Sequence, residues 1–306
     1  MNTLETITNN YLDFCKKQKR LDAKTIKAYR IDLRQFWEQI CVDSISQITP
    51  DILERYIAAL HQTYKPKTSK RKIASVKAFF HYLECRDFIE GNPMDKVQTR
   101  FREPVILPKI IPLHIIETLL SSMYHQKSLA KNRYQKKCII RDIAVIELLF
   151  STGMRISELC SLKPADVNLY EGDILIYGKG AKERKIQIGN DDVVLSLQNY
   201  QREYDLEISG CGYFFVNRLK RRLSEQSVRE MINRYADMAA INMHITPHMF
   251  RHSFATCLLE ADVDIRYIQE MLGHSSIHIT EIYTHVAMSK QKDILTKKHP
   301  RKDFLL

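Results

Sequence analysis

Hydrophobic residues recur every three or four positions through most of the chain, which predicts a largely helical protein. Before residue 90 this spacing predicts four helices, over 3–18, 22–42, 49–61 and from Pro66 onward. Asp22 and Thr49 are typical N-cap residues, and Pro50 suits a first helical turn. No convincing strand pattern occurs in this part, so we expect an N-terminal helical domain over residues 1–92.

A basic segment with repeated prolines follows, and it predicts a domain boundary. Gly91-Asn92-Pro93 ends the helical pattern, and further prolines occur up to Pro112. Repeated prolines without helical periodicity are typical of an extended linker. We therefore expect a linker over residues 93–112, which could lie along a DNA duplex between two domains.

The second domain, residues 113–306, mixes helical patterns with a few short strand patterns. Helices are expected over 113–125, 139–150, a short stretch from Arg155, 224–240, 247–260, 263–272 and 276–288. The β-branched, apolar run 173–177 and the alternating stretch 184–188 predict two strands, and a third short strand is expected at 213–216. The polar, aperiodic segment 126–137 is predicted to be a loop. The expected fold is mainly α with a small β-sheet, that is, an α+β domain.

Composition narrows the classes of protein. The chain has 306 residues, no run of 18 apolar residues, and no basic-then-apolar N-terminal signal, which predicts an intracellular, cytoplasmic protein with no membrane partner. Its seven cysteines are scattered and lack a C-x-x-C pair, which argues against a disulfide framework or a zinc ribbon.

A net charge of +11 favours a polyanionic partner, most simply nucleic acid. Basic residues concentrate at the start of the fourth helix, and we expect them to contact DNA phosphates: Lys65, Lys67, Lys70, Arg71, Lys72 and Lys77. For any single lysine, a solvated helix face remains the alternative.

The most informative stretch runs from Thr246 to His285. Thr246-Pro247 predicts a helix start, and His248 and Arg251, three residues apart, would then share one helix face. An imidazole beside an obligate cation near a helix N-terminus suits an anion such as phosphate. A solvated face is again the alternative for this pair alone.

Five motifs in a fixed order carry a stronger signal: Gly153-Met154-Arg155-x-x-Glu158-Leu159, Gly178-Lys179-Gly180-x-Lys182-Glu183-Arg184, His248-x-x-Arg251-His252, Leu272-Gly273-His274 and Tyr283-Thr284-His285. In this order they resemble the tyrosine site-specific recombinases of the phage integrase family, and most closely the Xer-type members. The resemblance spans nearly the whole chain. It implies a SAM-like, core-binding N-terminal domain joined to a catalytic domain that cleaves and rejoins DNA strands.

The resemblance also implies roles for individual residues. Arg155 and Arg251 match the arginines that hold the scissile phosphate, and His274 matches a position that hydrogen-bonds it. Arginine suits this role because its planar fork can bind two oxygens while staying charged.

Proton transfer and attack fall to three further positions. Tyr283 matches the nucleophile that forms a 3′-phosphotyrosine bond, and a tyrosine pKa of roughly 10 means that its attack needs a base. His248 matches the acid–base partner, and Lys179 matches the lysine that protonates the departing 5′ oxygen. Exchange of one phosphodiester for another requires neither ATP nor a metal, so no cofactor and no metal site are expected.

Other residues near the motifs have alternatives. Lys182 is a rival to Lys179 for the acid role, and Glu158 is expected to tether a neighbouring basic group. His252 and His285 are expected to be structural. His274 and His278 have the i,i+4 spacing of a metal pair, but no further ligands accompany them, so zinc is not predicted.

The resemblance implies double-stranded DNA as partner and four protomers on two DNA sites. The tetramer would be a homo-tetramer, or a hetero-tetramer with a paralogous recombinase, and a translocase or accessory protein could trigger it. The reaction would serve DNA integration and excision, or chromosome and plasmid dimer resolution. Alternatives are a type IB topoisomerase-like nicking enzyme and a non-catalytic DNA-binding regulator. One departure from the family is Asp262 in a turn where many relatives have glycine, and we expect it to adopt the left-handed conformation.

Overall fold

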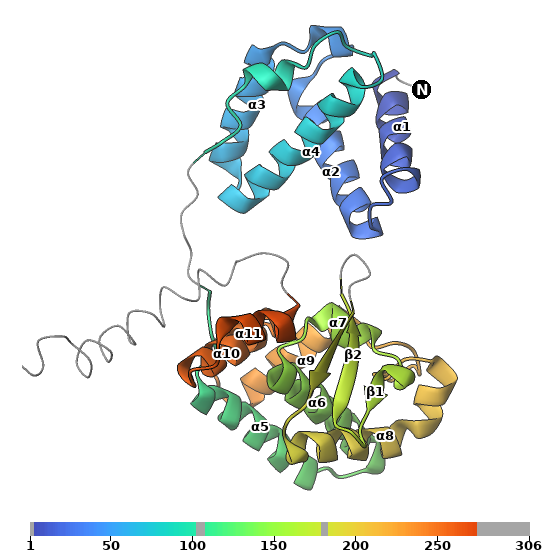
Figure 1. Ribbon diagram of the computed structural model, residues 1–306, viewed down its shortest axis with the longest axis vertical. Helices are drawn as coiled ribbons and strands as arrows, with labels where there is room; N and C mark the ends of the chain where they lie inside the picture. Colours follow the sequence, from blue (N-terminus) through green and yellow to red (C-terminus); the bar gives the residue numbers. More distant parts are fainter. Residues whose placement is uncertain (1–2, 102–107, 179–182, 274–306) are drawn as a thin grey trace, which may run out of the picture. The chain divides into compact units, whose positions relative to one another are not determined.

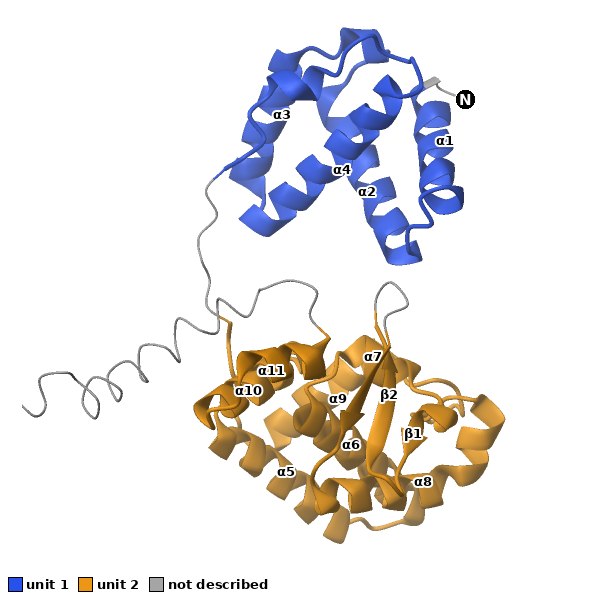
Figure 2. Ribbon diagram, viewed as in Figure 1, with its two compact units in different colours: residues 1–104 blue, residues 105–306 orange. Residues whose placement is uncertain are grey.

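The structure, a computed structural model, describes residues 3–101, 108–178 and 183–273. The chain divides into two compact units, residues 1–104 and residues 105–306 (Figure 2). Each unit has its own hydrophobic core. Within the described ranges, no helix combines the length and the apolar character needed to cross a membrane.

Unit 1 consists of four main helices, as predicted: α1 (Thr3–Lys17), α2 (Ala23–Ile40), α3 (Pro50–Thr63) and α4 (Pro66–Glu84) (Figure 1). A short 3₁₀ turn, η1 (Ile45–Gln47), lies between α2 and α3. The predicted caps form, because the Asp22 carboxylate accepts the Thr25 N–H and the Thr49 hydroxyl accepts the Ile52 N–H. The aromatic rings of Phe36 and Phe80 lie at the centre of the bundle with no exposed surface.

Both ends of the segment 93–112 contribute to folded cores. It begins with a 3₁₀ turn, η2 (Pro93–Lys96), and Met94 and Val97 are buried in the core of unit 1. At the other end Ile111 is buried in the core of unit 2, and its N–H donates to the Ser253 hydroxyl at 2.7 Å.

Unit 2 is built around one buried helix. Its helices are α5 (Leu113–Ser128), α6 (Arg133–Thr152), α7 (Ile156–Ser161), α8 (Asp191–Cys211), α9 (Glu225–Met238), α10 (Pro247–Glu260) and α11 (Ile265–Leu272), with a 3₁₀ turn η3 (Pro164–Asp166) (Figure 1). Helix α6 packs against α5, α8 and α10. Its residues Ile143, Ile146 and Leu149 are buried, as expected of a helix that is apolar on most sides.

A three-stranded antiparallel sheet, in the order β1-β2-β3, accompanies these helices: β1 (Val167–Asn168), β2 (Asp173–Tyr177) and β3 (Glu183–Gln187). Ile174 pairs with Ile186 across β2 and β3, and both side chains are buried. The two predicted strands of this hairpin and the predicted class, mainly α with a small sheet, are therefore confirmed.

The predicted strand at 213–216 is wrong. Only one isolated bridge forms there, between Val216 and Arg222. Phe214 and Phe215 are both buried, so the apolar run faces the core on consecutive residues and does not alternate. The Tyr200 hydroxyl satisfies two of the backbone groups that a neighbouring strand would bond. It donates to the Phe214 carbonyl at 2.8 Å and accepts the Val216 N–H at 3.0 Å.

The predicted loop at 126–137 is also wrong, because most of it is helical. Helix α5 continues to Ser128, and α6 already begins at Arg133. Asn132 is the missed signal, since its side chain accepts the Gln135 N–H at 2.8 Å and caps α6.

Helix α8 was not predicted, although its sequence carries the usual signals. Asn190 caps it by accepting the Val193 N–H. Its buried face repeats at helical spacing through Leu197, Tyr200 and Tyr204. Between α10 and α11, Asp262 has a φ of +63°, which confirms the expected left-handed turn.

Candidate active site

Three arginines from different elements of unit 2 gather around one carboxylate. The carboxylate of Glu158 on α7 accepts a hydrogen bond from Nη1 of Arg155 at 2.7 Å. It accepts two more from Arg184 on β3, from Nη1 at 3.1 Å and from Nη2 at 2.8 Å. A Glu158 oxygen also accepts the Arg155 backbone N–H at 2.8 Å, which caps the start of α7. The side chain of Glu158 is only 5% exposed, so this carboxylate tethers two cations and does not face solvent. The predicted tethering role is confirmed.

Arg251 is the third arginine, and it is held at the ends of two helices. Its Nη1 donates to the Gly153 carbonyl at 2.8 Å, and its Nη2 donates to the Leu272 carbonyl at 2.5 Å. These carbonyls lie at the C-termini of α6 and α11, where the helix dipole favours a positive charge. Thr246 and Pro247 start α10 as predicted, and the helix carries Arg251 into this position with 5% of its surface exposed.

Two glycines of the motifs are required by this close packing. Gly153 and Gly273 end α6 and α11 in the left-handed conformation, with φ values of +58° and +63°. A Cβ on Gly153 would lie 2.6 Å from the ring of Phe254, and one on Gly273 would lie 2.9 Å from Nη1 of Arg184. A side chain at position 153 would therefore displace Phe254 of α10, and one at position 273 would displace the guanidinium of Arg184.

The charges of the cluster favour an anion. Burial alone would raise the pKa of Glu158, but its bonds to Arg184 and Arg155 outweigh burial and hold the pKa below its usual value. Burial, then the positive charge of Arg155, lowers the pKa of Arg251 to about 9, so its guanidinium stays charged at neutral pH. Three cations around one anion leave two positive charges in a partly enclosed space. A phosphodiester would offset them.

His248 lies one helical turn before Arg251 on α10. The residue reaches solvent, yet enough protein surrounds the imidazole that desolvation, followed by the charges of Arg251, Arg229 and Arg155, lowers its pKa. It is therefore neutral at pH 7 and able to accept a proton.

The structure brings together Arg155, His248 and Arg251 of the six predicted catalytic residues. Lys179, His274 and Tyr283 lie outside the described residues, as do the alternatives Lys182, His278 and His285 and the predicted helix 276–288. His252, expected to be structural, is partly buried on α10.

The basic residues predicted to contact DNA separate into two groups. The first is exposed at the start or along one face of α4: Lys65, Lys67, Lys70 and Lys77. The second neutralises Asp32, a fully buried carboxylate of α2, through Arg71 Nη1 and Lys72 Nζ. Lys72 is 2% exposed and also donates to Gln35, so its ammonium group belongs to the interior of unit 1. This burial contradicts its prediction as a DNA contact.

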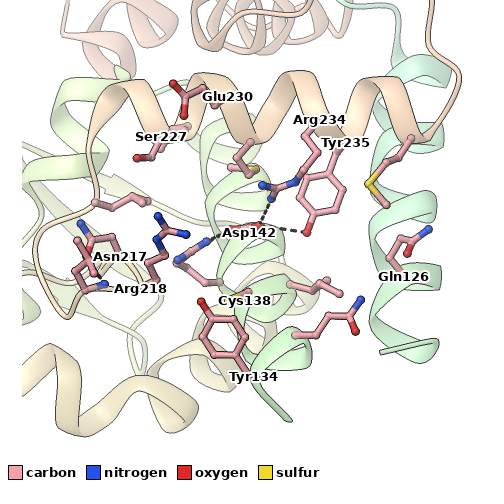
Figure 3. Close-up of a pocket in the computed structure, with 18 of the residues that line it drawn as sticks. Gln126, Tyr134, Cys138, Asp142, Asn217, Arg218, Ser227, Glu230, Arg234 and Tyr235 are labelled. Atoms are coloured by element: carbon pink, nitrogen blue, oxygen red, sulfur yellow. Dashed lines mark hydrogen bonds and ion pairs between the residues drawn. The ribbon is translucent and has the colours of Figure 1, made fainter. Parts of the chain in front are cut away.

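A cleft of about 790 Å³ lies elsewhere in unit 2, between α5, α6, α9 and the segment 217–223 (Figure 3). In it Asp142 accepts bonds from Arg141, from Arg234 at 3.0 Å and from the Tyr235 hydroxyl at 3.2 Å. None of Arg155, His248 and Arg251, the three predicted catalytic residues in the described part, lines this cleft. The Asp142 cluster ties α6 to α9, and we assign it a structural role.

The fold and the arginine cluster together define the class of protein. The phage integrase family matches residues 122–290, and the N-terminal SAM-like domain of phage integrases matches residues 8–87. The chain therefore belongs to the phage integrase family, and it is a tyrosine site-specific recombinase, an enzyme that cleaves and rejoins DNA.

The chain is also similar to individual tyrosine recombinases and to solved structures of this fold. A tyrosine recombinase of Agathobacter rectalis is 62% identical over 99% of both chains. The tyrosine recombinase XerD of Listeria monocytogenes is 36% identical over 97% of this chain and all of that one. Among solved structures, XerH recombinase bound to a palindromic difH substrate has a TM-score of 0.75 at 23% identity, covering 95% of this chain and 84% of that one. The last likeness concerns the fold alone.

Arg184 is the residue of the cluster to which the sequence assigned no role. It occurs inside a quoted motif, but its partners Glu158 and Met271 are 26 and 87 residues away. Nothing in the local sequence pairs these positions.

Proposed function

We propose that this chain cleaves one DNA strand at a specific site through Tyr283, forming a 3′-phosphotyrosine bond, and then rejoins that strand to a partner duplex. The observation that carries the proposal is the meeting of Arg155 and Arg251 beside Glu158 and His248, in a chain that belongs to the phage integrase family.

The chemistry follows from the charges of this cluster. As the tyrosine oxygen attacks phosphorus, negative charge grows on the two non-bridging oxygens, and Arg155 and Arg251 would bind them. The neutral imidazole of His248 would accept the phenolic proton. Lys179 would donate a proton to the departing 5′ oxygen, and His274 would donate a hydrogen bond to the phosphate. Because one phosphodiester replaces another, the proposed reaction requires no cofactor.

Double-stranded DNA is the proposed partner, and the tetramer is the proposed assembly. The structure of XerH is a complex with a difH substrate, and that of lambda integrase is a dimer bound to a COC′ core site. In this chain, we assign phosphate contacts to Lys65, Lys67, Lys70 and Lys77 of α4, which are exposed. Four copies on two sites, or two copies with two of a paralogous recombinase, would exchange strands, with a translocase or accessory protein as trigger. Because its substrate is chromosomal or plasmid DNA, we propose that the enzyme acts in the cytoplasm.

Covalent trapping tests the proposal. Purified protein is incubated in EDTA with DNA from its own genomic neighbourhood that carries a nick close to each candidate site, so that cleavage releases a short fragment and cannot reverse. We expect a protein–DNA adduct on denaturing gels at one sequence and not at scrambled DNA.

Two other outcomes would contradict the proposal in different ways. Relaxation of supercoiled plasmids that lack the site would indicate a topoisomerase-like activity. Tight, sequence-specific binding without any adduct, with a paralogous recombinase also present, would indicate a regulator.

Proton acceptance by His248 predicts an acid limb in the pH profile. The pKa of His248 lies below the ordinary value of about 6.5, so the imidazole is neutral at pH 7 and protonates only as the pH falls below that value. The adduct-forming rate at subsaturating DNA, which reports the free enzyme, should be flat near pH 7 and fall below pH 6.5.

The matched control is His244→Gln, at an exposed histidine just before α10, which should keep the acid limb. A His248→Gln variant should be slower and lose this limb. An unchanged limb in His248→Gln would assign the titration to another group.

A further inference from the structure

Arg184 uses all three of its guanidinium nitrogens in contacts with other elements of unit 2. Its Nη1 and Nη2 grip both oxygens of Glu158 at 3.1 and 2.8 Å, and its Nε donates to the Met271 carbonyl at 2.8 Å. Its side chain is 10% exposed, whereas that of Arg155 is 33% exposed. Arg184 therefore faces protein, while Arg155 keeps access to a ligand.

These contacts join three elements of unit 2, namely β3, α7 and α11. Arg184 itself lies on β3, Glu158 belongs to α7 and holds Arg155, and Met271 lies in the last turn of α11. Arg251 binds the next carbonyl of that turn, on Leu272. The C-terminus of α11 is thus held by two arginines, one from β3 and one from α10.

We propose that Arg184 is a positioning residue for DNA cleavage. Through Glu158 it fixes the guanidinium of Arg155, and its bond to the Met271 carbonyl holds the guanidinium of Arg184 itself in the required orientation. The proposal rests on the proposed function, since it requires Arg155 to bind the scissile phosphate.

Only an arginine fits this position. A bidentate contact to a carboxylate plus a third bond to a carbonyl requires a planar group with donors in several directions, and a lysine ammonium is a single point on a flexible stem. Gly273 belongs to the same arrangement, because a Cβ there would lie 2.9 Å from Nη1 of Arg184.

Without Arg184, Glu158 would bind Arg155 alone, and α7 would lose its ion pair to β3. Arg155 would then sample orientations that no longer meet the phosphate. Misplacement of a catalytic group by about 1 Å can cost about a hundredfold in rate.

The test is a kinetic double-mutant cycle on single-turnover adduct formation with the nicked substrate. Arg184→Gln should lower the rate about a hundredfold. Arg155→Gln should lower it roughly 100- to 1,000-fold. Arg184 acts through Arg155, so its loss should matter little once Arg155 is already replaced. The rate of the double variant should therefore lie within about threefold of the rate of Arg155→Gln.

Lys185→Gln is the matched control. This neighbour on β3 pairs with Asp173 at 2.7 Å and is 63% exposed, so its loss removes one positive charge from the same strand without touching the cluster. It should keep its rate, and Arg184→Gln should stay folded and keep its site affinity, with a lower midpoint of thermal unfolding because a buried ion pair is lost. Arg184→Lys, which retains the charge, should be as slow as Arg184→Gln.

Any other result would contradict either this inference or the proposed function. Losses that multiply in the double variant, or full activity in Arg184→Lys, would contradict the positioning role. Failure of both Arg184 variants to fold would make the residue purely structural. Wild-type adduct with unaffected Arg184 variants would overturn this inference alone, whereas absence of any wild-type adduct would overturn the proposed function as well.

Discussion

Tyr283→Phe should bind the recombination site as tightly as the wild type and form no covalent adduct. The substitution removes only the phenolic oxygen, which is the atom that would be esterified to phosphorus, and it leaves the ring in place. The measurement compares a mobility-shift titration with the denaturing-gel assay on the same nicked DNA. Tyr267→Phe is the control, because Tyr267 is a tyrosine of α11 that is 63% exposed and should remain fully active.

The chain has 15 tyrosines, but the structure shows that several of them are unsuited to replace Tyr283 as the nucleophile. Burial raises the pKa of Tyr200, Tyr204 and Tyr235, so their phenolate forms are disfavoured and their hydroxyls are poor nucleophiles. An adduct that survives in Tyr283→Phe would have to form on another residue, and mass spectrometry of the adducted peptide would identify it.

Local signals were sufficient for the elements that carry the site. Thr246-Pro247 begins α10 as predicted, and the i,i+3 spacing places His248 and Arg251 on one side of that helix. The hairpin strands, predicted at 173–177 from a β-branched apolar run and at 184–188 from alternation, form at 173–177 and 183–187. In each case the determinant is a short stretch whose own caps, prolines or periodicity specify the structure.

Long-range partners explain what the sequence could not predict. Lys72 lies among exposed lysines, and its burial depends on Asp32 and Gln35, which lie 40 and 37 residues earlier in the chain. Tyr200 similarly replaces a strand partner for 213–216. The role of Arg184 depends on Met271, 87 residues away, so no window of the sequence contains both partners.

Arg251→Lys should lower the rate of adduct formation roughly 100- to 1,000-fold. The lysine keeps one positive charge, but a single ammonium cannot reach the Gly153 and Leu272 carbonyls and bind a phosphate oxygen in the same geometry. Arg222→Lys is the matched control, since Arg222 also donates to a backbone carbonyl, that of Cys160, at 2.7 Å and lies outside the cluster. Its rate should stay within about threefold of the wild type.

The Arg251→Lys variant should also distinguish the contribution of Arg251 to phosphate binding from its contribution to the stability of the fold. The pKa of Arg251 is lowered to about 9 by burial and by the charges of Arg155 and Arg184, so holding it protonated at pH 7 opposes folding, and a bound phosphate would relieve this opposition. Site DNA should therefore raise the midpoint of thermal unfolding more for the wild type than for Arg251→Lys. Equal increments, together with an unchanged cleavage rate, would show that Arg251 stabilises the ends of α6 and α11 and does not bind the scissile phosphate.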